Sequence, residues 1–507
     1  GFQTRDIRMK QSWKALLLSL SLTLLPAPAW SESLKIPASP QERINELLPE
    51  LSAEEFDYLA TLMKADQLYQ AGEKEQAATL YKKVKASFQP ETNSPRKPYT
   101  DSASLPPGGQ VYWDYGSAEI DPKLESKTLG PLKLLTEKHP NFIPGHVRYA
   151  EALVYFGQTE KAIDHLETAV YRYPQQLPLV EALLPLYEQT EKWLDASLVA
   201  RHFALINADH SQANYYQTLA DQHLEKYQSK LRSRLRENAF AGIVTGALTY
   251  ALTGSLFGPF SAIESTSLLL QGESAVGDKL ASRLKEQLPL IEDEEVNQYV
   301  TEIGMTLAQY TGRDSFDYEF YVIMDENLNA FALPGGKIFI NAGAILKTDS
   351  EAELAGLIAH ELSHAVLSHG FQLVTEGNLL ANVTQFIPYG GTAANIIVLD
   401  YSRDMERQAD ELGTRILASS EYAADGLYHL MEALVEENQD EPRPPVWLST
   451  HPNTKERVDN IKTQIVENGY NRYTYEGISR HLEIQEKVAQ LLADYQAERE
   501  GDDTPEN

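Results

Sequence analysis

The chain has 507 residues, more than one ordinary domain holds, and this length predicts two or three domains. Hydrophobic residues make up 42% of it, enough for packed cores, so wholesale disorder is excluded. The formal net charge of −29 argues against a nucleic-acid partner, because phosphates demand a basic surface. There is no cysteine, which excludes disulfides, thiol catalysis and cysteine-bound zinc.

The first residues have the pattern of an export signal. Lys10 and Lys14 supply positive charge before an apolar run, Ala15–Leu25, and small residues suited to cleavage follow. Residues 1–31 are therefore predicted to be a signal peptide with an extended start. A retained anchor is the alternative, although the run is short for a membrane-spanning helix.

Residues 41–235 are predicted to form helical repeats of the tetratricopeptide type. In RYAEALVYFGQTEKAIDHLETAVYRYP, small residues recur where two antiparallel helices would approach closely, and a proline closes the second helix. The positions are Ala150, Gly157, Ala162, Leu166, Ala169 and Pro174. ADQLYQAGEKEQAATLYKKV repeats the pattern with Gly72 and Ala77. Two roles fit these repeats: a concave surface that binds peptides or partner proteins, or a helical spacer.

Two long runs carry no charged residue, Ala239–Ile263 and Asn378–Leu399. The first is long enough to span a bilayer, but its glycines, its threonines and Pro259 lower its hydrophobicity and break helices. We expect both runs to pack as hydrophobic hairpins or to touch a membrane surface without spanning it. A true membrane span is the alternative.

Residues 236–475 are predicted to be a separate domain in which strand and helix patterns mix. DYEFYVIMD indicates a strand, FALPGGKIFINAGAI a turn and a strand, and SEAELAGLIAHELSHAVLSHG a helix. The last segment, 476–507, is predicted to be a helix near Ile484–Ala497 followed by a disordered acidic tail, GDDTPEN. The fold class is thus α+β and mostly helical, with a small β-sheet.

The segment His360-Glu361-Leu362-Ser363-His364 has the pattern HExxH. Residues four apart lie on one face of a helix, so both imidazoles can bind one zinc ion. Glu361 then lies beside the metal, where it can take a proton from a water molecule. The pattern also arises by chance, in which case the residues are only the polar face of a helix. Ser350 and Glu353 predict a capping box where this helix begins.

A catalytic zinc site needs a third protein ligand. In SRDMERQADELG, Glu406 and Asp410 lie four apart on another predicted helix. Glu406 can complete the ligand set, and Asp410 can orient an imidazole from outside it. The alternative for this pair is a solvated acidic helix face. His369 follows His364 by five residues and would point about 140° around a helix from it, so we expect a capping or surface histidine.

These motifs, in this order, resemble the gluzincin metallopeptidases of the HtpX/BepA type. The resemblance covers roughly Leu268–Gly469 and also includes NAFALPGGKIFINAGAI and THPNTKERV. It implies one Zn²⁺ per chain held by His360, His364 and Glu406, with Glu361 as the general base. Such proteases carry tetratricopeptide repeats after the catalytic domain, whereas here the repeats come first.

The resemblance gives two further segments a role. Asn329–Ala332 resembles the family's active-site edge strand, whose backbone pairs with an extended substrate; an ordinary edge strand is the alternative. His451-Pro452 with Arg457 resembles the family's HPxxxxR element. There the histidine can approach the zinc and keep the enzyme latent. Two other roles fit His451: it stabilises the transition state, or it lies where the chain enters a helix.

The sequence therefore predicts an exported zinc-dependent endopeptidase with an N-terminal repeat region, in the periplasm of a Gram-negative-type bacterium. Its expected substrates are unfolded or misassembled envelope proteins. Its expected partners are proteins that bind the repeats. The charge-free runs are expected to contact a membrane surface. The rival hypothesis is an adaptor or chaperone, in which the repeats bind clients and the zinc site is structural or latent.

Overall fold

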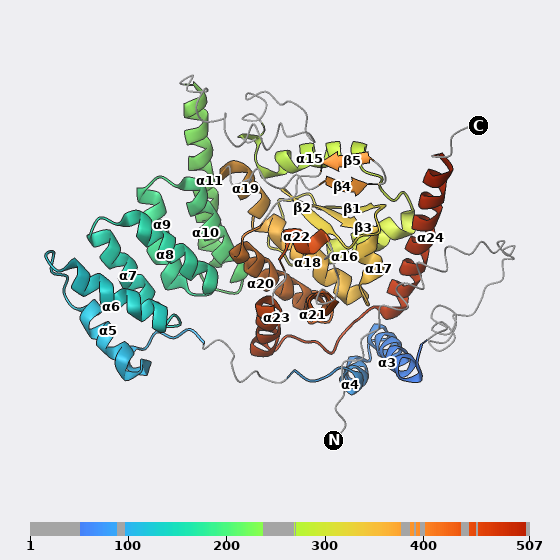
Figure 1. Cartoon of the computed structure of the whole chain (residues 1–507), viewed down its shortest axis with the longest axis horizontal. Helices are drawn as coiled ribbons and strands as arrows, with labels where there is room; N and C mark the ends of the chain where they lie inside the picture. Colours follow the sequence, from blue (N-terminus) through green and yellow to red (C-terminus); the bar gives the residue numbers. More distant parts are fainter. Residues whose placement is uncertain are drawn as a thin grey trace. The chain divides into compact units, whose positions relative to one another are not determined.

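The computed structural model of the chain consists mainly of helices, together with a small β-sheet (Figure 1). The structure describes residues 51–88, 97–236, 268, 270–376, 386–389, 392–395, 401–437, 446–452 and 455–502. The chain divides into two compact units, one made of residues 91–243 and the other of the residues before and after them. We call these the repeat unit and the sheet unit. The mostly helical α+β fold class is confirmed.

The repeat unit is a series of helices in which each packs against the next. After a short turn, η1 (Ser102–Ser104), they are α5 (Pro107–Ser117), α6 (Glu125–Lys138), α7 (Ile143–Tyr155), α8 (Thr159–Arg172), α9 (Leu177–Gln189), α10 (Trp193–Ile206) and α11 (Ala213–Arg236). Ala150 and Ala162 are buried where α7 meets α8, and Gly157 turns the chain between them with φ 74°. The tetratricopeptide assignment itself stays a prediction.

The sheet unit is built on three strands with the order β1-β3-β2. The strands are β1 (Glu319–Ile323), β2 (Ala330–Leu333) and β3 (Lys337–Asn341). β1 runs parallel to β3, with Tyr321 opposite Phe339, and β2 runs antiparallel to β3, with Phe331 opposite Phe339. Within the described sheet, β2 pairs only with β3, so the segment expected to be an edge strand lies at an edge.

Helices surround this sheet (Figure 1). They are α15 (Glu273–Gln287), α16 (Glu294–Ala308), α17 (Ala342–Lys347), α18 (Glu351–Val366), α19 (His369–Glu376), α20 (Arg403–Ser419), α21 (Gly426–Glu437), α22 (Val446–Thr450), α23 (Lys455–Asn468) and α24 (Ile478–Asp502). The central helix is α18, which packs against β2, α16, α20 and α21. It is buried along its whole length except for a partly exposed Glu353.

The first described helices belong to the sheet unit and not to the repeat unit. They are α3 (Ala53–Gln70) and α4 (Lys74–Val84), which pack against each other, and α3 also contacts α24. The single repeat region expected at 41–235 is therefore divided between the two units. Sequence periodicity could not reveal this, because a hairpin with small residues at its crossing reads the same whatever it packs against.

The C-terminal helix also differs from its expected form. The sequence predicts a helix over Ile484–Ala497 and a tail from residue 501, whereas α24 extends from Ile478 to Asp502. It packs against α16 and α17 and so belongs to the sheet unit. Residues 503–507 lie outside the described residues, as does the expected signal peptide, 1–31.

The charge-free runs are described only in part. Residues 239–263 lie outside the described residues. Within 378–399, β4 (Phe386–Tyr389) and β5 (Thr392–Asn395) pair antiparallel, with Phe386 opposite Asn395. Among the described residues, no helix combines the length and the apolar character that a membrane span requires.

Candidate metal centre

The helix that carries HELSH begins with a side-chain cap. The Ser350 hydroxyl accepts the backbone N–H of Glu353 (3.1 Å), which satisfies one of the free donors of the first turn. The expected capping box is only half formed, because the Glu353 carboxylate accepts the N–H of Asp349 (2.8 Å) instead of that of Ser350. Further along α18, the helix α20 packs closely against it through Gly413. A Cβ atom at Gly413 would lie 3.1 Å from the backbone nitrogen of His360.

This close approach brings four candidate ligands together. His360 and His364 come from α18, Glu406 from α20, and His451 follows α22 directly. One ligand atom from each lies within 4.8 Å of all the others, and all four side chains are buried. The Nε2 atoms of His360 and His364 are 3.1 Å apart. His451 Nδ1 lies 2.8 Å from Glu406 Oε1 and 3.4 Å from His360 Nε2.

The protonation pattern of this cluster fits a bound cation. His360 Nδ1 lies 3.0 Å from the Asp410 carboxylate, so its proton is on Nδ1 and its Nε2 offers a lone pair when the ring is neutral. Burial lowers the pKa of His360, but Asp410 and Glu406 outweigh this effect and raise the pKa to about 9. Burial lowers the pKa of His364 well below its usual range. The carboxylates thus favour one positive charge between the two rings, where a metal ion would lie.

Glu361 is buried beside the cluster on its own helix. The Trp447 indole N–H donates to Glu361 Oε1 (2.8 Å), and His451 Nε2 lies 3.5 Å from the same oxygen. Burial raises the pKa of Glu361, against the opposing effect of the nearby His451 and His360. A carboxylate with a raised pKa is a better proton acceptor in a reaction at neutral pH.

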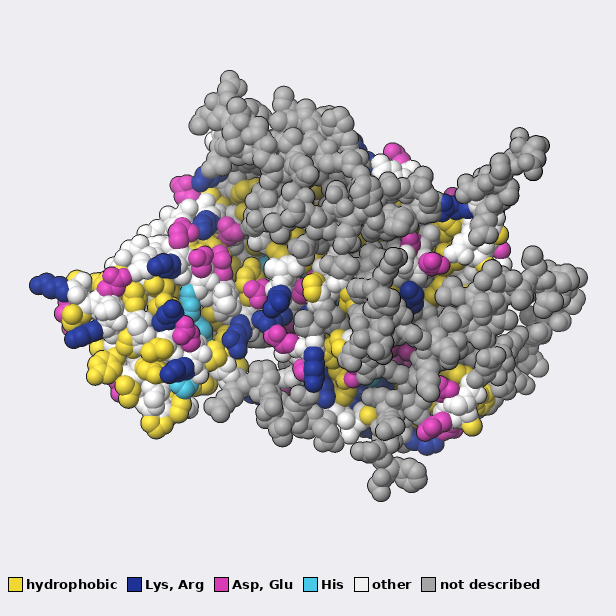
Figure 2. Space-filling view, viewed as in Figure 1, with side chains coloured by type: hydrophobic (Ala, Val, Ile, Leu, Met, Phe, Trp, Pro, Cys, Tyr) yellow, Lys and Arg dark blue, Asp and Glu magenta, His cyan; other side chains and the backbone are white. Residues whose placement is uncertain are grey.

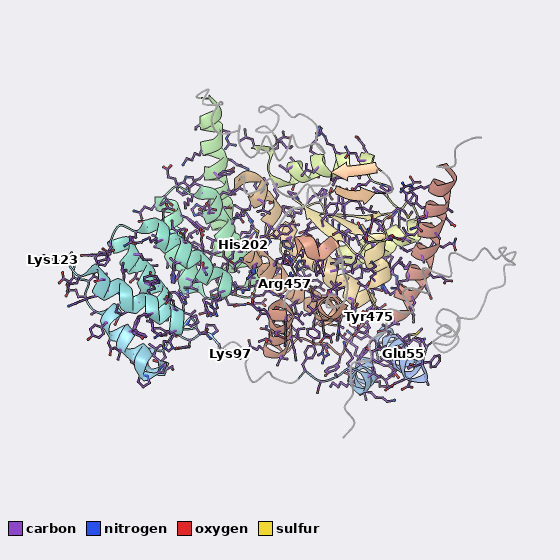
Figure 3. The ribbon with its side chains drawn as sticks, in the orientation of Figure 1. Glu55, Lys97, Lys123, His202, Arg457 and Tyr475 are labelled. Atoms are coloured by element: carbon purple, nitrogen blue, oxygen red, sulfur yellow. The ribbon has the colours of Figure 1, made fainter. Side chains whose placement is uncertain are left out.

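Asp410 and Arg457 form the layer behind the ligands. Arg457, labelled in Figure 3, donates through Nε (2.7 Å) and Nη2 (2.8 Å) to the two oxygens of Asp410. Its Nη1 lies 2.8 Å from Glu406 Oε2. Burial raises the pKa of Asp410, but Arg457 outweighs it and holds that pKa below its usual value. Both carboxylates are therefore kept ionised, as a cation site requires.

The structure thus brings together His360, Glu361, His364, Glu406, Asp410 and His451, the residues that the sequence singled out. It also shows residues that the sequence did not single out. Tyr401 stacks on the His364 ring, with centroids 3.8 Å apart, and Trp447 stacks on His451 at 4.9 Å. Trp447 precedes His451 by four residues. This spacing of about one helical turn indicates that the two side chains contact each other, so the sequence did contain a signal for Trp447.

The expectation of a capping or surface position for His369 is wrong. Its side chain is fully buried, and its Nδ1 lies 2.9 Å from Nδ1 of His364. The expectation assumed one unbroken helix, but the chain breaks between α18 and α19. His369 remains outside the set of four candidate ligands.

Comparison with known proteins finds similarity in part of the sheet unit. Residues 294–465, which include α18, α20 and His451, match peptidase family M48. The beta-barrel assembly-enhancing protease of Escherichia coli K12 is 25% identical over 218 residues, covering 39% of this chain and 45% of that protein. The Yersinia pestis protein of the same name is 25% identical over 217 residues, with the same coverage.

A third relative comes from a eukaryote. The mitochondrial metalloendopeptidase OMA1 of Schizosaccharomyces pombe is 25% identical over 185 residues, covering 35% of this chain and 55% of that protein. The chain therefore spans about half the length of the curated relatives that it matches. The similarity supports the domain's chemistry more directly than it supports the substrates or partners of the whole protein.

Proposed function

We propose that the M48 peptidase domain at residues 294–465 makes this chain a zinc-dependent endopeptidase. One observation carries the proposal: a buried two-histidine, one-glutamate cluster lies directly beside the buried carboxylate of Glu361. His360, His364 and Glu406 would hold the ion, since imidazole and carboxylate are the donors that catalytic zinc uses. When bound, zinc supplies a Lewis acid that polarises a carbonyl and makes water more acidic.

The residues of the chain perform the remaining steps. Glu361 accepts the proton of the attacking water and passes it to the leaving amine, for which its raised pKa is suited. The Trp447 N–H fixes one oxygen of this carboxylate. Asp410 and Arg457 hold His360 and Glu406 in orientation from behind.

The substrate class that we propose is unfolded or misassembled polypeptide of the bacterial envelope. An extended chain can add to an edge strand through backbone hydrogen bonds, and β2 is at an edge of the described sheet, next to α18. The names of the bacterial relatives refer to beta-barrel assembly, which supports a role in envelope protein quality control and a periplasmic location after export.

The repeat unit would bind client or partner proteins. Hydrophobic side chains gather on its visible face around α5 and α6 (Figure 2). Among the side chains of these two helices, Val111, Tyr115 and Leu134 are 51%, 66% and 38% exposed. Exposed apolar side chains in one region are typical of protein-binding surfaces. Contact with a membrane surface through residues 239–263 or 378–399 is a further part of the proposal.

The decisive experiment measures metal content and casein cleavage for the wild type and for Glu361→Gln. Glutamine keeps the shape and the Trp447 contact but cannot accept a proton. We expect one zinc per chain in both proteins and a rate at least about 10²-fold lower in the variant. Equal cleavage by both proteins would refute the mechanism. An inactive wild type that still binds unfolded clients would favour the adaptor hypothesis.

A further inference from the structure

His369 reaches the candidate metal site only because the helix before it breaks. On a continuous helix its ring would point about 140° away from that of His364. Instead α18 ends at Val366, Ser368 adopts φ 59°, and α19 begins at His369. This break turns the His369 ring back, so that the two Nδ1 atoms lie 2.9 Å apart.

The break is held by an ion pair from two other parts of the sheet unit. Arg313 Nη1 donates to the Val366 carbonyl (2.9 Å), and the Ser368 hydroxyl donates to Glu273 Oε2 (2.8 Å). The same Glu273 oxygen lies 3.3 Å from Arg313 Nη2. A left-handed backbone is strained at serine and persists only where the surrounding structure fixes it. The position of His369 is therefore imposed by the fold.

The hydrogen bonds of His369 determine which of its nitrogens carries the proton. Its Nε2 lies 2.9 Å from the side-chain carbonyl oxygen of Gln408, which can only accept, so the proton is on Nε2. Nδ1 of the neutral ring then has a lone pair and accepts the Nδ1–H of His364. This leaves Nε2 of His364 as a lone-pair donor, and that atom faces His360 Nε2 at 3.1 Å.

We propose that His369 and Gln408 form a hydrogen-bond relay that holds His364 in the tautomer able to bind the metal through Nε2. His369 is thus a positioning residue and not a ligand. The inference rests on the proposed metal site and extends it. The two histidine ligands are held differently, since His360 faces a carboxylate, Asp410, whereas His364 faces an imidazole that is itself bonded to an amide.

Of the two supporting residues, Gln408 lies on a helix that already supplies a ligand, and His369 lies on the helix that follows α18. Gln408 follows Glu406 by two residues on α20, and His369 opens the helix next to α18. All three relay side chains are buried, with 0%, 0% and 1% exposure for His364, His369 and Gln408. Water therefore does not replace a missing partner easily, and loss of one acceptor leaves a buried N–H unpaired.

The test compares His369→Leu with His369→Gln. Leucine fills space but accepts no hydrogen bond, whereas the glutamine carbonyl can accept the His364 Nδ1–H. Zinc affinity is measured by competition with a chromogenic chelator, and ring ¹⁵N chemical shifts of labelled histidine report the tautomer. We expect His369→Leu to bind zinc about 10–100-fold more weakly and to lose the single His364 tautomer. His369→Gln should recover most of the affinity and retain the tautomer.

Leu417→Ala is the matched control, because Leu417 is buried on α20, nine residues beyond Gln408 in sequence. It should lower the melting temperature and leave zinc affinity unchanged. Equal affinity of wild type and His369→Leu would overturn the relay, as would equal losses in the Leu and Gln variants. A folded wild type that binds no zinc would instead overturn the proposed metal site, and the relay with it.

Discussion

His451 is the residue whose position has the clearest consequence for activity. It provides the fourth candidate ligand, with Nδ1 2.8 Å from Glu406 and 3.4 Å from His360 Nε2. A catalytic zinc site keeps one position open for water. An imidazole in that position would exclude the water, so this arrangement favours the latent state over a role in transition-state stabilisation.

We therefore expect His451→Ala to raise casein cleavage several-fold at matched zinc occupancy. The other three ligands should retain the metal, so zinc content should stay at one per chain. Trp447→Phe serves as a comparison, because it removes the N–H that contacts Glu361 and leaves His451 in place. A lower rate in His451→Ala, with zinc retained, would mean that the imidazole assists the reaction.

Sequence reasoning worked for residues whose geometry is local. Four-residue spacing on a helix puts His360 and His364 on one face, and likewise Glu406 and Asp410, but it does not say that these two helices meet. Trp447 contacts Glu361 across 86 positions of sequence, which no periodicity encodes. The sequence predicts a capping or surface position for His369, because nothing in it marks Ser368 as a residue with a left-handed backbone.

At the scale of elements, Lys85 attaches the α3–α4 hairpin to the sheet unit. Its ammonium group is buried, lies 2.7 Å from Asp425 Oδ1, pairs with Glu476, and donates to the Arg472 carbonyl (2.7 Å). Burial lowers the pKa of Lys85, but Asp425 and Glu476 outweigh it and raise that pKa. A buried charge network of this kind depends on every partner being present.

Lys85→Met should therefore reduce the free energy of unfolding by about 3–5 kcal/mol, because it removes the buried cation that pairs with Glu476 and leaves Asp425 with only Arg472 and His429. Urea denaturation followed by circular dichroism measures the change. Lys74→Met is the control, since Lys74 pairs with Glu421 at the same junction but both side chains are exposed. An unchanged unfolding midpoint in Lys85→Met would show that the hairpin is not anchored by this network.

Asp66 makes the same junction sensitive to pH. It accepts the backbone N–H groups of Glu476 (3.0 Å) and Ile478 (2.9 Å), where α24 begins. Burial nevertheless raises its pKa from 3.8 to about 7, outweighing these bonds and that of Tyr81. Between those values the folded state binds more protons than the unfolded state, so stability falls as pH rises through this window.

The corresponding prediction compares wild type with Asp66→Asn at pH 5.5 and pH 7.5. The wild type should lose stability relative to the variant at the higher pH, because asparagine does not ionise. Urea midpoints at both values provide the measurement. If the urea midpoint of the wild type instead rose relative to that of the variant at the higher pH, the backbone N–H donors would be keeping Asp66 ionised at both pH values.

For the whole molecule, contact with a membrane is a prediction from the two charge-free runs. We predict that the charge-free runs touch a membrane surface without crossing it. Alkaline carbonate should then release the full-length protein from isolated membranes, with an integral membrane protein of the same preparation as the reference. Retention in the pellet after removal of the signal would mean that at least one run is integral.

The sheet unit is discontinuous in sequence, since residues 51–88 precede the repeat unit and residues 268–502 follow it. Asp66 bonds to residues about 410 positions later, and Lys85 to one 391 positions later. Contacts of such sequence separation form late in folding. During synthesis the α3–α4 hairpin therefore cannot make these contacts until α24 has been made. The repeat unit, which lies between them in sequence, can fold first. A chain synthesised only up to α24 would leave exposed the face of the hairpin that α24 covers in the folded unit.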